Sequence, residues 1–504
     1  MVLIERFRAA PRATQLLVAL AAAHVALKLF LLAFVGQVTL CCDQVSYNDG
    51  AMALSNLVRD LAGGGPIHLA ELQRNLVGGG WFTPGSSIAL APLYVVDPHA
   101  STFAVRAYLG LFSSLLLLLT VIQVRRVLGD LFAIVLMLLV GLSPTWLLFS
   151  MAAWGDLIAG LLATILLMEL ITLMRTLVAG RAPRLLDGIR FGVAAVATVY
   201  ARSSSTLLIL GMGVVLAVTA LVGLRGRVRW RALLSFVVAA VSFVALLAPW
   251  SAFASYTLKS RVITTTTVPV VMSITFGDRD RVCFGPCDPM FNPGTTTGNT
   301  WFPPMQYSRE VQRATGRSEV EVEKQMWTYT RPSVTPHSYT KDVIADFGRY
   351  AGKPASFAKL LMPDGPHGIV YWLVFVLTYL AWIPLLLAVF ALILARLRAT
   401  VDQQVVALLT TIGLGALFTQ PFVHIGTGRY WTTAAPLAAL ALALLIRAWD
   451  ARRDAPRFSG APWVVDASAE AVAPAVRTWL TGAQLVLAGL TVLAVVGVLG
   501  LGLT

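Results

Sequence analysis

The stretch that decides the fold runs from Thr14 to Gln37 and reads TQLLVALAAAHVALKLFLLAFVGQ. It is almost entirely apolar over about 24 residues, and a helix needs about 20 such residues to cross the hydrocarbon core of a bilayer. Basic residues precede this run and no small-residue cleavage site follows it, so we expect a first spanning helix rather than a removable leader. The chain should therefore fold within a membrane.

The composition of the whole chain agrees with this expectation. Of its 504 residues, 57% are hydrophobic and only 13% are charged, and the mean hydropathy of +0.75 lies above the range of soluble domains. The net charge of +14 reflects arginines and lysines in short segments between apolar runs, where they set topology and contact anionic headgroups. No basic face with interleaved aromatic residues is present, so nucleic acid is not an expected partner.

Each long apolar run should be a helix, because lipid cannot satisfy free backbone polar groups. The fold class that follows is an all-α, polytopic membrane protein with about eleven spans, at residues 14–37, 104–123, 131–150, 157–178, 188–201, 205–223, 232–250, 368–395, 404–422, 432–447 and 479–503. We divide the chain into three parts. Residues 1–250 form a transmembrane module that includes the first outer loop 38–103, residues 251–366 form an extracytoplasmic loop or cap, and residues 367–504 form the C-terminal spans.

Arginine clusters occur at alternate ends of these spans, for example at Arg125 and Arg126 and again from Arg225 to Arg231. The positive-inside rule places such ends, and with them the N-terminus, in the cytoplasm. We therefore expect a multi-pass plasma-membrane protein whose loops 38–103 and 251–366 face the extracytoplasmic side.

All four cysteines fall on that outer side, where an oxidising compartment permits disulfides, at Cys41, Cys42, Cys283 and Cys287. We do not expect the vicinal pair to bridge itself, so a link between the two loops is the candidate, with its connectivity open. The CFGPC segment lacks a second ligand pair at zinc-site spacing, which makes a zinc site the weaker interpretation.

The first outer loop contains two helical patterns. Leu54, Leu57, Val58 and Leu61 share one face, and Leu69, Leu72 and Leu76 share another, with GGG breaks at 63–65 and 78–80. Two short amphipathic helices at the membrane interface are expected. The segment REVQRATGRSEVEVEKQMW, at 309–327, predicts a further helix in the large loop.

Two aspartates are the leading functional candidates, because an ionisable group beside an apolar span is costly. Asp43 and Asp156 each lie at the outer end of an apolar run, and bundling of the helices would bring both to one cavity. The alternative is that both are solvated loop acids. For Lys28 and Glu169, which lie inside spans, a structural ion pair is favoured over a proton relay.

Two arginines accompany these acids on the outer side. Arg202 interrupts TVYARSSSTLL and Arg429 interrupts GTGRYW, and guanidinium geometry suits a phosphate group. The alternative for each is snorkelling or pairing with an acid. Walker A, GxSxG, HExxH and dinucleotide motifs are missing from the sequence, so neither soluble-nucleotide chemistry nor zinc proteolysis is indicated.

The order of these features resembles the GT-C superfamily of polytopic glycosyltransferases, in particular the branch of protein O-mannosyltransferases and lipid A aminoarabinose transferases. The similarity covers about the first 260 residues and the 420s to 440s, in DQVSYNDGAMALSNLVRDL, WFTPGSSIALAPLYVV, STFAVRAYLGLFSS, LSPTWLLFSMAAWGDLIAGLL, LLAPWSAF and TGRYWTTAAPLAAL. The resemblance implies a GT-C-like bundle with interfacial helices in the first outer loop and a small extracytoplasmic cap. It implies a polyprenyl-phosphate sugar donor and a glycan, glycolipid or protein acceptor, with membrane lipid as a further partner.

The chain departs from the family pattern at two places. Gln44 and Ser46 stand where members often carry an acid and an arginine, and Phe82 or Thr83 stands where some carry a lysine. We therefore assign the donor phosphate to three other cations, Arg202, Arg429 and Lys359. Site-lining and acceptor contacts are assigned to Tyr47, Gln44, Trp154 and Tyr430.

The mechanism that the resemblance implies is inverting transfer of the sugar to an acceptor hydroxyl. Asp43 would be the general base, while Asp156 would orient the acceptor or Asp43, or help hold a divalent cation, and the metal requirement stays open. The rival hypotheses are a membrane transporter or lipid flippase with Asp43 and Asp156 as coupling groups, and a polytopic assembly subunit without a reaction of its own.

Overall fold

The computed structural model describes residues 10–276, 316–355, 357–362, 368–394, 401–424, 428–450 and 474–503. Within these ranges the chain is helical and contains no strand. Nine helices of the described part are long and apolar enough to cross a membrane, so the chain is an α-helical, multi-pass membrane protein. They are α2 (Arg12–Val35), α6 (Thr102–Leu128), α9 (Asp156–Val178), α11 (Thr206–Gly223), α12 (Gly226–Leu258), α17 (Ile369–Leu394), α18 (Val401–Phe418), α19 (Trp431–Asp450) and α20 (Pro474–Leu503).

The other two expected spans, 131–150 and 188–201, correspond to shorter helices. The first is divided into α7 (Asp130–Leu136), the π-helical turn η2 (Met137–Gly141) and α8 (Pro144–Phe149). Ser143 is extended before Pro144, because a proline disfavours helical backbone in the residue before it. The second is α10 (Leu185–Ala201), which has 17 residues and packs between α9 and α12.

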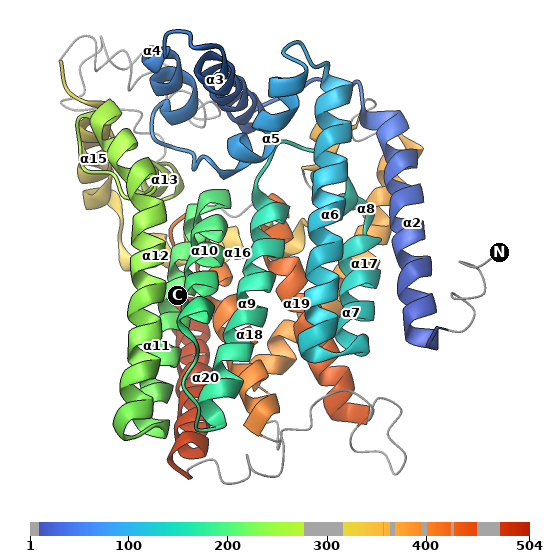
Figure 1. Cartoon of the computed structure of the whole chain (residues 1–504), viewed down its shortest axis with the longest axis vertical. Coiled ribbons are helices and arrows are strands. Elements are labelled where there is room, and N and C mark those ends of the chain that lie inside the picture. The colour runs from blue at the N-terminus through green and yellow to red at the C-terminus, as the bar shows by residue number, and fades with distance from the viewer. Residues whose placement is uncertain are drawn as a thin grey trace.

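The helices of the first loop lie together at one end of the bundle, the upper end in Figure 1. They are α3 (Asp43–Gly63), α4 (Leu69–Leu72), the π-helical turn η1 (Gln73–Val77) and α5 (Gly85–Val96). Helix α3 starts at Asp43 itself and ends at Gly64, whose positive φ of 67° closes the helix. Helix α5, which carries Pro92, was not among the expected elements.

The large loop contributes further helices from its described residues. They are α13 (Val268–Thr275), α15 (Glu319–Thr330), η5 (Arg331–Ser333), α16 (Pro336–Gly352) and η6 (Ala358–Leu361). Helix α15 begins ten residues later than the segment that predicted it, at a capping box in which Ser318 and Glu321 bond each other's backbone N–H. The short 3-10 turns are η3 (Ser203–Ser205), η8 (Gln420–Phe422) and η9 (Gly428–Tyr430).

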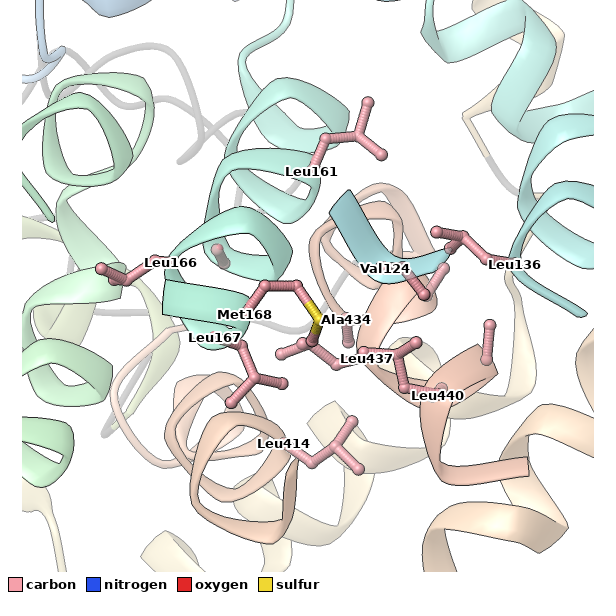
Figure 2. Close-up of a cluster of buried hydrophobic side chains, with 14 of the residues drawn as sticks. Val124, Leu136, Leu161, Leu166, Leu167, Met168, Leu414, Ala434, Leu437 and Leu440 are labelled. Atoms are coloured by element: carbon pink, nitrogen blue, oxygen red, sulfur yellow. The ribbon is translucent and has the colours of Figure 1, made fainter. Parts of the chain in front are cut away.

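Helices α9 and α19 are the most deeply buried of the spans. Side chains of α6, α7, α9, α18 and α19 meet in one apolar core, part of which is drawn in Figure 2. Gly160 on α9 permits this packing, because a Cβ there would lie 2.7 Å from the main-chain oxygen of Thr433. The two central helices can approach backbone to backbone only at such a position.

Arginines mark the end of the bundle opposite to α3 and α5. Arg125 and Arg126 lie in the last turn of α6, Arg175 lies in the last turn of α9, and Arg447 lies in the last turn of α19. These helix ends gather at the lower end in Figure 1. The described part of the chain thus carries its basic helix ends on one side and its first loop on the other.

The expected pair between Lys28 and Glu169 is wrong. Lys28 Nζ donates to the main-chain oxygen of Gly110 and to the hydroxyls of Ser113 and Ser114, whereas Glu169 accepts from Gln123. Three oxygen acceptors match the three N–H donors of the ammonium group. The rotation of each helix about its axis decides such pairs, and hydropathy does not report that rotation.

Candidate functional site

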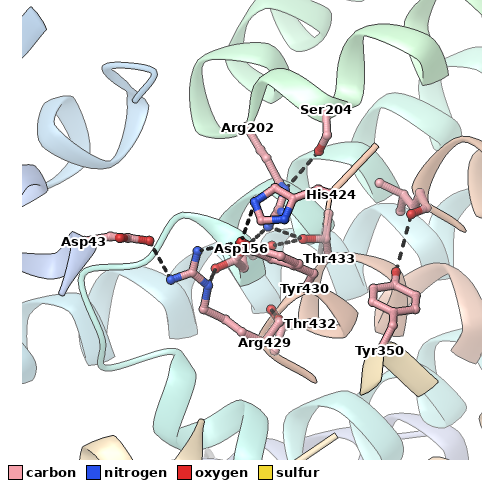
Figure 3. A network of polar contacts seen from close by, with 11 residues as sticks. Asp43, Asp156, Arg202, Ser204, Tyr350, His424, Arg429, Tyr430, Thr432 and Thr433 are labelled. Atoms are coloured by element: carbon pink, nitrogen blue, oxygen red, sulfur yellow. Dashed lines mark hydrogen bonds and ion pairs between the residues drawn. The ribbon is translucent and has the colours of Figure 1, made fainter. Parts of the chain in front are cut away.

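Arg429 joins the two aspartates that the sequence singles out, as Figure 3 shows. Its Nη1 lies 2.7 Å from Oδ2 of Asp43, and its Nε lies 3.1 Å from Oδ2 of Asp156. The contact with Asp43 is a hydrogen-bonded ion pair, while Nε of Arg429 makes no aligned hydrogen bond. Residues 386 positions apart in the sequence therefore meet at one guanidinium.

Arg202 completes a chain of alternating charges. Its Nη1 forms an ion pair with Oδ1 of Asp156, its Nε donates to the hydroxyl of Ser204 at 2.9 Å, and Thr433 donates to the main-chain oxygen of Asp156 at 3.1 Å. The order of the chain is Asp43, Arg429, Asp156, Arg202. Two positive and two negative side chains balance, which is the condition under which buried charges are tolerated.

Aromatic rings surround the two guanidinium groups. The carbon Cζ of Arg202 lies 4.2 Å and that of Arg429 lies 4.9 Å from the centre of the Tyr430 ring. Trp154 and Phe357 face Arg429 at 5.3 and 5.5 Å. Cations over aromatic faces at these distances are attracted by the ring quadrupole, so the rings help to hold the guanidinium planes.

The two carboxylates differ in access to solvent. The side chain of Asp156 is 6% exposed and that of Asp43 is 30% exposed, while Arg202 and Arg429 are 13% and 12% exposed. Asp43 is therefore the group of the four that a second molecule reaches most easily. Asp156 is the interior anchor that both arginines share.

Helix starts position both acids. Asp43 is the first residue of α3 and Asp156 is the first residue of α9. Each carboxylate lies where the unpaired N–H groups of a helix favour negative charge. Arg202 follows α10 in extended conformation, and Arg429 lies in the turn η9 just before α19.

Gly155 lets the start of α9 approach Arg202. A Cβ on Gly155 would lie 2.6 Å from the main-chain oxygen of Ala201, and Ala201 immediately precedes Arg202. Any larger side chain at this corner would separate Asp156 from its partner. The sequence WGD at 154–156 thus combines a ring, a close approach and a carboxylate.

The predicted lining residues divide into two groups. Trp154 and Tyr430 contact the guanidinium groups, and the Tyr47 ring, which packs on Phe82 at 5.0 Å, lies close enough for the Asp43 charge to act on it. Burial, with the Asp43 charge second, raises the pKa of the Tyr47 phenol above its usual value. Gln44 is fully buried and accepts from the main-chain N–H of Ala153 at 3.3 Å, so it fixes α3 to the Trp154 corner.

Lys359 is exposed in η6, two residues beyond Phe357. Among the described residues, no hydrogen bond or ion pair links it to the four charged side chains, so the structure does not join this third predicted phosphate ligand to the site. Cys41 and Cys42 are free thiols next to Asp43. Cys283 and Cys287 lie outside the described residues.

The sequence interpretation missed several residues of the site. Thr433 holds the backbone of Asp156, His424 Nε2 lies 3.2 Å from the Tyr430 hydroxyl, and Phe357 faces Arg429. The segment TGRYWTT did signal Thr433, because a hydroxyl one turn into an apolar helix beside an arginine is a candidate contact. Phe357 carried no signal, since no motif marks it and its contact with Arg429 joins segments far apart in the sequence.

The donor set at this site does not fit a divalent cation well. In the described part of the chain, no group of three or more His, Cys, Asp or Glu side chains could hold a metal. Asp43 and Asp156 are each paired with arginine, so a cation would have to displace a guanidinium from its carboxylate.

Comparison of the chain with models of protein families, with curated proteins and with solved structures finds no match. The class of the protein, a multi-pass α-helical membrane protein with a cluster of paired charges at one end of its bundle, rests on its own fold and geometry.

Proposed function

We propose that the protein is an inverting glycosyltransferase of the GT-C type. It moves a sugar from a polyprenyl-phosphate donor to an acceptor hydroxyl on the extracytoplasmic side of the plasma membrane. The observation that carries this proposal is the alternating chain of Asp43, Arg429, Asp156 and Arg202 at the loop-rich end of the bundle. Asp43, Asp156 and Arg429 come from segments in which the sequence resembles that superfamily.

The arginines supply the electrostatic part of the proposed reaction. As the acceptor oxygen attacks the anomeric carbon, the bond to the lipid phosphate breaks and negative charge develops on the departing phosphate. Guanidinium groups held by rings and carboxylates need little reorganisation to stabilise that charge. Attack on the face opposite the phosphate inverts the anomeric centre.

Asp43 supplies the base. Its side chain, 30% exposed, is the more accessible carboxylate, and it would accept the proton of the acceptor hydroxyl. General base catalysis of this kind contributes about 10² to 10⁴ in rate, or roughly 3 to 5 kcal/mol. Asp156 holds both arginines and orients them.

Binding of the donor also changes the partner of Asp43. One oxygen of that carboxylate accepts from Arg429 Nη1 at 2.7 Å, and a phosphate at the outer edge of Arg429 competes for the same N–H. When the Nη1–H of Arg429 bonds to the phosphate instead, the Asp43 oxygen is free to accept from the hydroxyl that attacks the sugar. The donor would therefore bind first and prepare the base.

The test uses purified protein in nanodiscs with a panel of polyprenyl-phosphate sugars and candidate acceptors. Wild-type protein should consume one donor, and Asp43→Asn should abolish consumption while folding persists. Asp49→Asn is the matched control, because Asp49 lies on the same helix outside the charge chain. Donor movement across the bilayer without consumption would instead favour the transporter or flippase, and unchanged behaviour of Asp43→Asn would favour an assembly subunit.

A further inference from the structure

Cys41 and Cys42 form a close pair of thiols immediately before Asp43. The Sγ atoms lie 3.2 Å apart, with Cys42 donating to Cys41, and both residues are partly accessible. Cys42 has a φ of 58°, in the left-handed region that favours glycine. This backbone turns two consecutive side chains toward the same side, where an extended chain would point them to opposite faces.

In contrast to the expectation from the sequence, we propose that Cys41 and Cys42 are a redox-active dithiol that closes reversibly to a vicinal disulfide by exchange with a disulfide-bearing oxidant. Cys41 attacks one sulfur of the oxidant and releases the first thiolate. Cys42 then loses its proton, attacks the sulfur of Cys41 and releases the second thiolate. The two cysteines lose two electrons and two protons, and the disulfide of the oxidant is reduced to two thiols.

The hydrogen bonds assign the first attack to Cys41. Its sulfur accepts from Cys42 and, at 3.8 Å, from Nε2 of Gln44, whereas the Cys42 thiol is engaged as a donor. Burial raises the pKa of the Cys42 thiol to about 12. Because the thiolate is the nucleophile, Cys42 reacts second, after the mixed disulfide has placed a sulfur beside it.

A disulfide between neighbours is easily reduced. Consecutive Cα atoms are about 3.8 Å apart, whereas disulfides ordinarily join Cα atoms about 4.4 to 6.8 Å apart. The closed ring is therefore strained, and strained disulfides have more oxidising potentials and are the labile ones. The pair is suited to a reversible change and not to permanent cross-linking.

The position of the pair connects its redox state to the charge chain. Upstream, Arg106 donates to the main-chain oxygen of Val38 at 2.7 Å, and downstream Gln44 accepts from Ala153. The ring that closes contains the Cys41–Cys42 peptide, so closure distorts that peptide, and because both flanks are held the adjoining backbone at Asp43 shifts with it. The carboxylate that pairs with Arg429 is displaced as a result, and this consequence for transfer rests on the proposed function.

The first experiment follows the thiols without any activity assay. Full-length protein in nanodiscs is equilibrated in glutathione buffers of increasing potential, alkylated and digested for mass spectrometry. The peptide with both cysteines should lose two hydrogen atoms and resist alkylation, and mild reduction should reverse both changes. A bond from either residue to Cys283 or Cys287, or thiols that stay alkylatable at every potential, would overturn the proposal.

The control variant is Cys42→Gly, since glycine adopts the positive φ without strain and removes the second thiol. A variant that replaces Cys283 and Cys287 by serine should keep the redox change of the wild type. In sugar transfer, oxidation should lower the wild-type rate roughly tenfold or more, with recovery on reduction and no effect in Cys42→Gly. A disulfide that forms without changing transfer would overturn the connection to Asp43, whereas the mass change is measured even if no sugar is transferred.

Discussion

At the scale of the residue, the carboxylates of the site and the proposed phosphate would compete for the guanidinium of Arg429. The Arg429 guanidinium is shared between Asp43 and Asp156, so the proposed phosphate would gain this arginine only when a carboxylate releases it. Hydrogen bonds to charged groups are worth about 1.5 to 3 kcal/mol. The strength of the proposed phosphate binding should therefore depend on the acids as much as on the arginines.

Replacement of Asp43 by Asn should tighten binding of a polyprenyl phosphate that carries no sugar. The amide competes less strongly for Arg429, and we expect the Kd to fall roughly tenfold, or about 1.4 kcal/mol. Fluorescence or calorimetric titration in nanodiscs measures this change. Asp49→Asn should leave the Kd unaltered, and weaker binding by Asp43→Asn would refute the competition.

Arg202→Met should be strongly destabilising. Asp156 is 6% exposed and would keep only the unaligned contact with Arg429, and breaking one partner of a buried ion pair costs about 3 to 5 kcal/mol. Thermal unfolding in detergent should show a lower midpoint, while Arg227→Met, at an exposed position, should unfold like the wild type. Addition of Asp156→Asn to Arg202→Met should restore part of the loss, and equal midpoints for wild type and Arg202→Met would contradict the ion pair.

Asp49 should make stability depend on pH. Partial burial raises the pKa of this carboxyl above its usual value, so the folded state binds its proton more tightly than the unfolded state does. Stability then falls as pH rises from the unfolded pKa through the folded pKa. Asp49→Asn removes this penalty, and its unfolding midpoint should exceed that of the wild type at pH 7 and match it in acid. A midpoint difference that is constant across pH would point to another cause.

At the scale of the element, close approach of α9 and α19 positions the charge chain. A Cβ at Gly160 would lie 2.7 and 2.9 Å from the main-chain oxygens of Thr433 and Thr432. Backbone atoms of a packed helix cannot move aside cheaply, so the two helices would separate. Asp156 and Arg429 lie at the starts of these same helices and would separate with them.

Gly160→Ala should therefore destabilise the protein by about 1 to 3 kcal/mol and impair transfer. Gly213→Ala on α11 is the matched control, because a Cβ there meets nothing within 4 Å and alanine favours a helix by roughly 0.5 to 1 kcal/mol. Unfolding midpoints of the two variants should move in opposite directions. If both rise, the contact between α9 and α19 is looser than the structure describes.

Hydropathy predicts the positions of the helices in the sequence better than it predicts which side chains of different helices contact each other. The apolar runs identify the spans, because length and composition alone decide whether a helix crosses a bilayer. Pairing of Asp156 with Arg202 and the binding of Lys28 by Ser113 and Ser114 depend on helix rotation and tilt, which an all-round apolar helix does not encode. The contact of Gln44 with Ala153 was not predicted for the same reason, since the rotation of α3 decides which neighbour a side chain meets.

At the scale of the whole molecule, charge and loops are segregated along the bundle axis. Arginine-rich helix ends lie at one end, and the helices of the first loop lie at the other (Figure 1). Helix α12 has 33 residues, or about 50 Å, which exceeds a hydrocarbon core of about 30 Å. It is therefore long enough to cross the hydrocarbon core with several turns to spare.

Labelling from opposite sides should confirm the expected orientation. In a variant without the four native cysteines, H68C and R227C place single thiols at exposed positions at the two ends. An impermeant maleimide should label H68C in intact cells and R227C only after permeabilisation. Labelling of R227C in intact cells would reverse the proposed side of the reaction.

The starts of α3 and α9 have a consequence for what the site attracts. Each helix start contributes roughly half a positive charge, and the paired side chains cancel one another, so a surplus of about one positive charge is left. A single phosphodiester carries the opposite charge. A free sugar, which is neutral, should therefore gain no electrostatic attraction here. The lipid-linked phosphate should bind first, before the hydroxyl groups of the sugar make specific contacts.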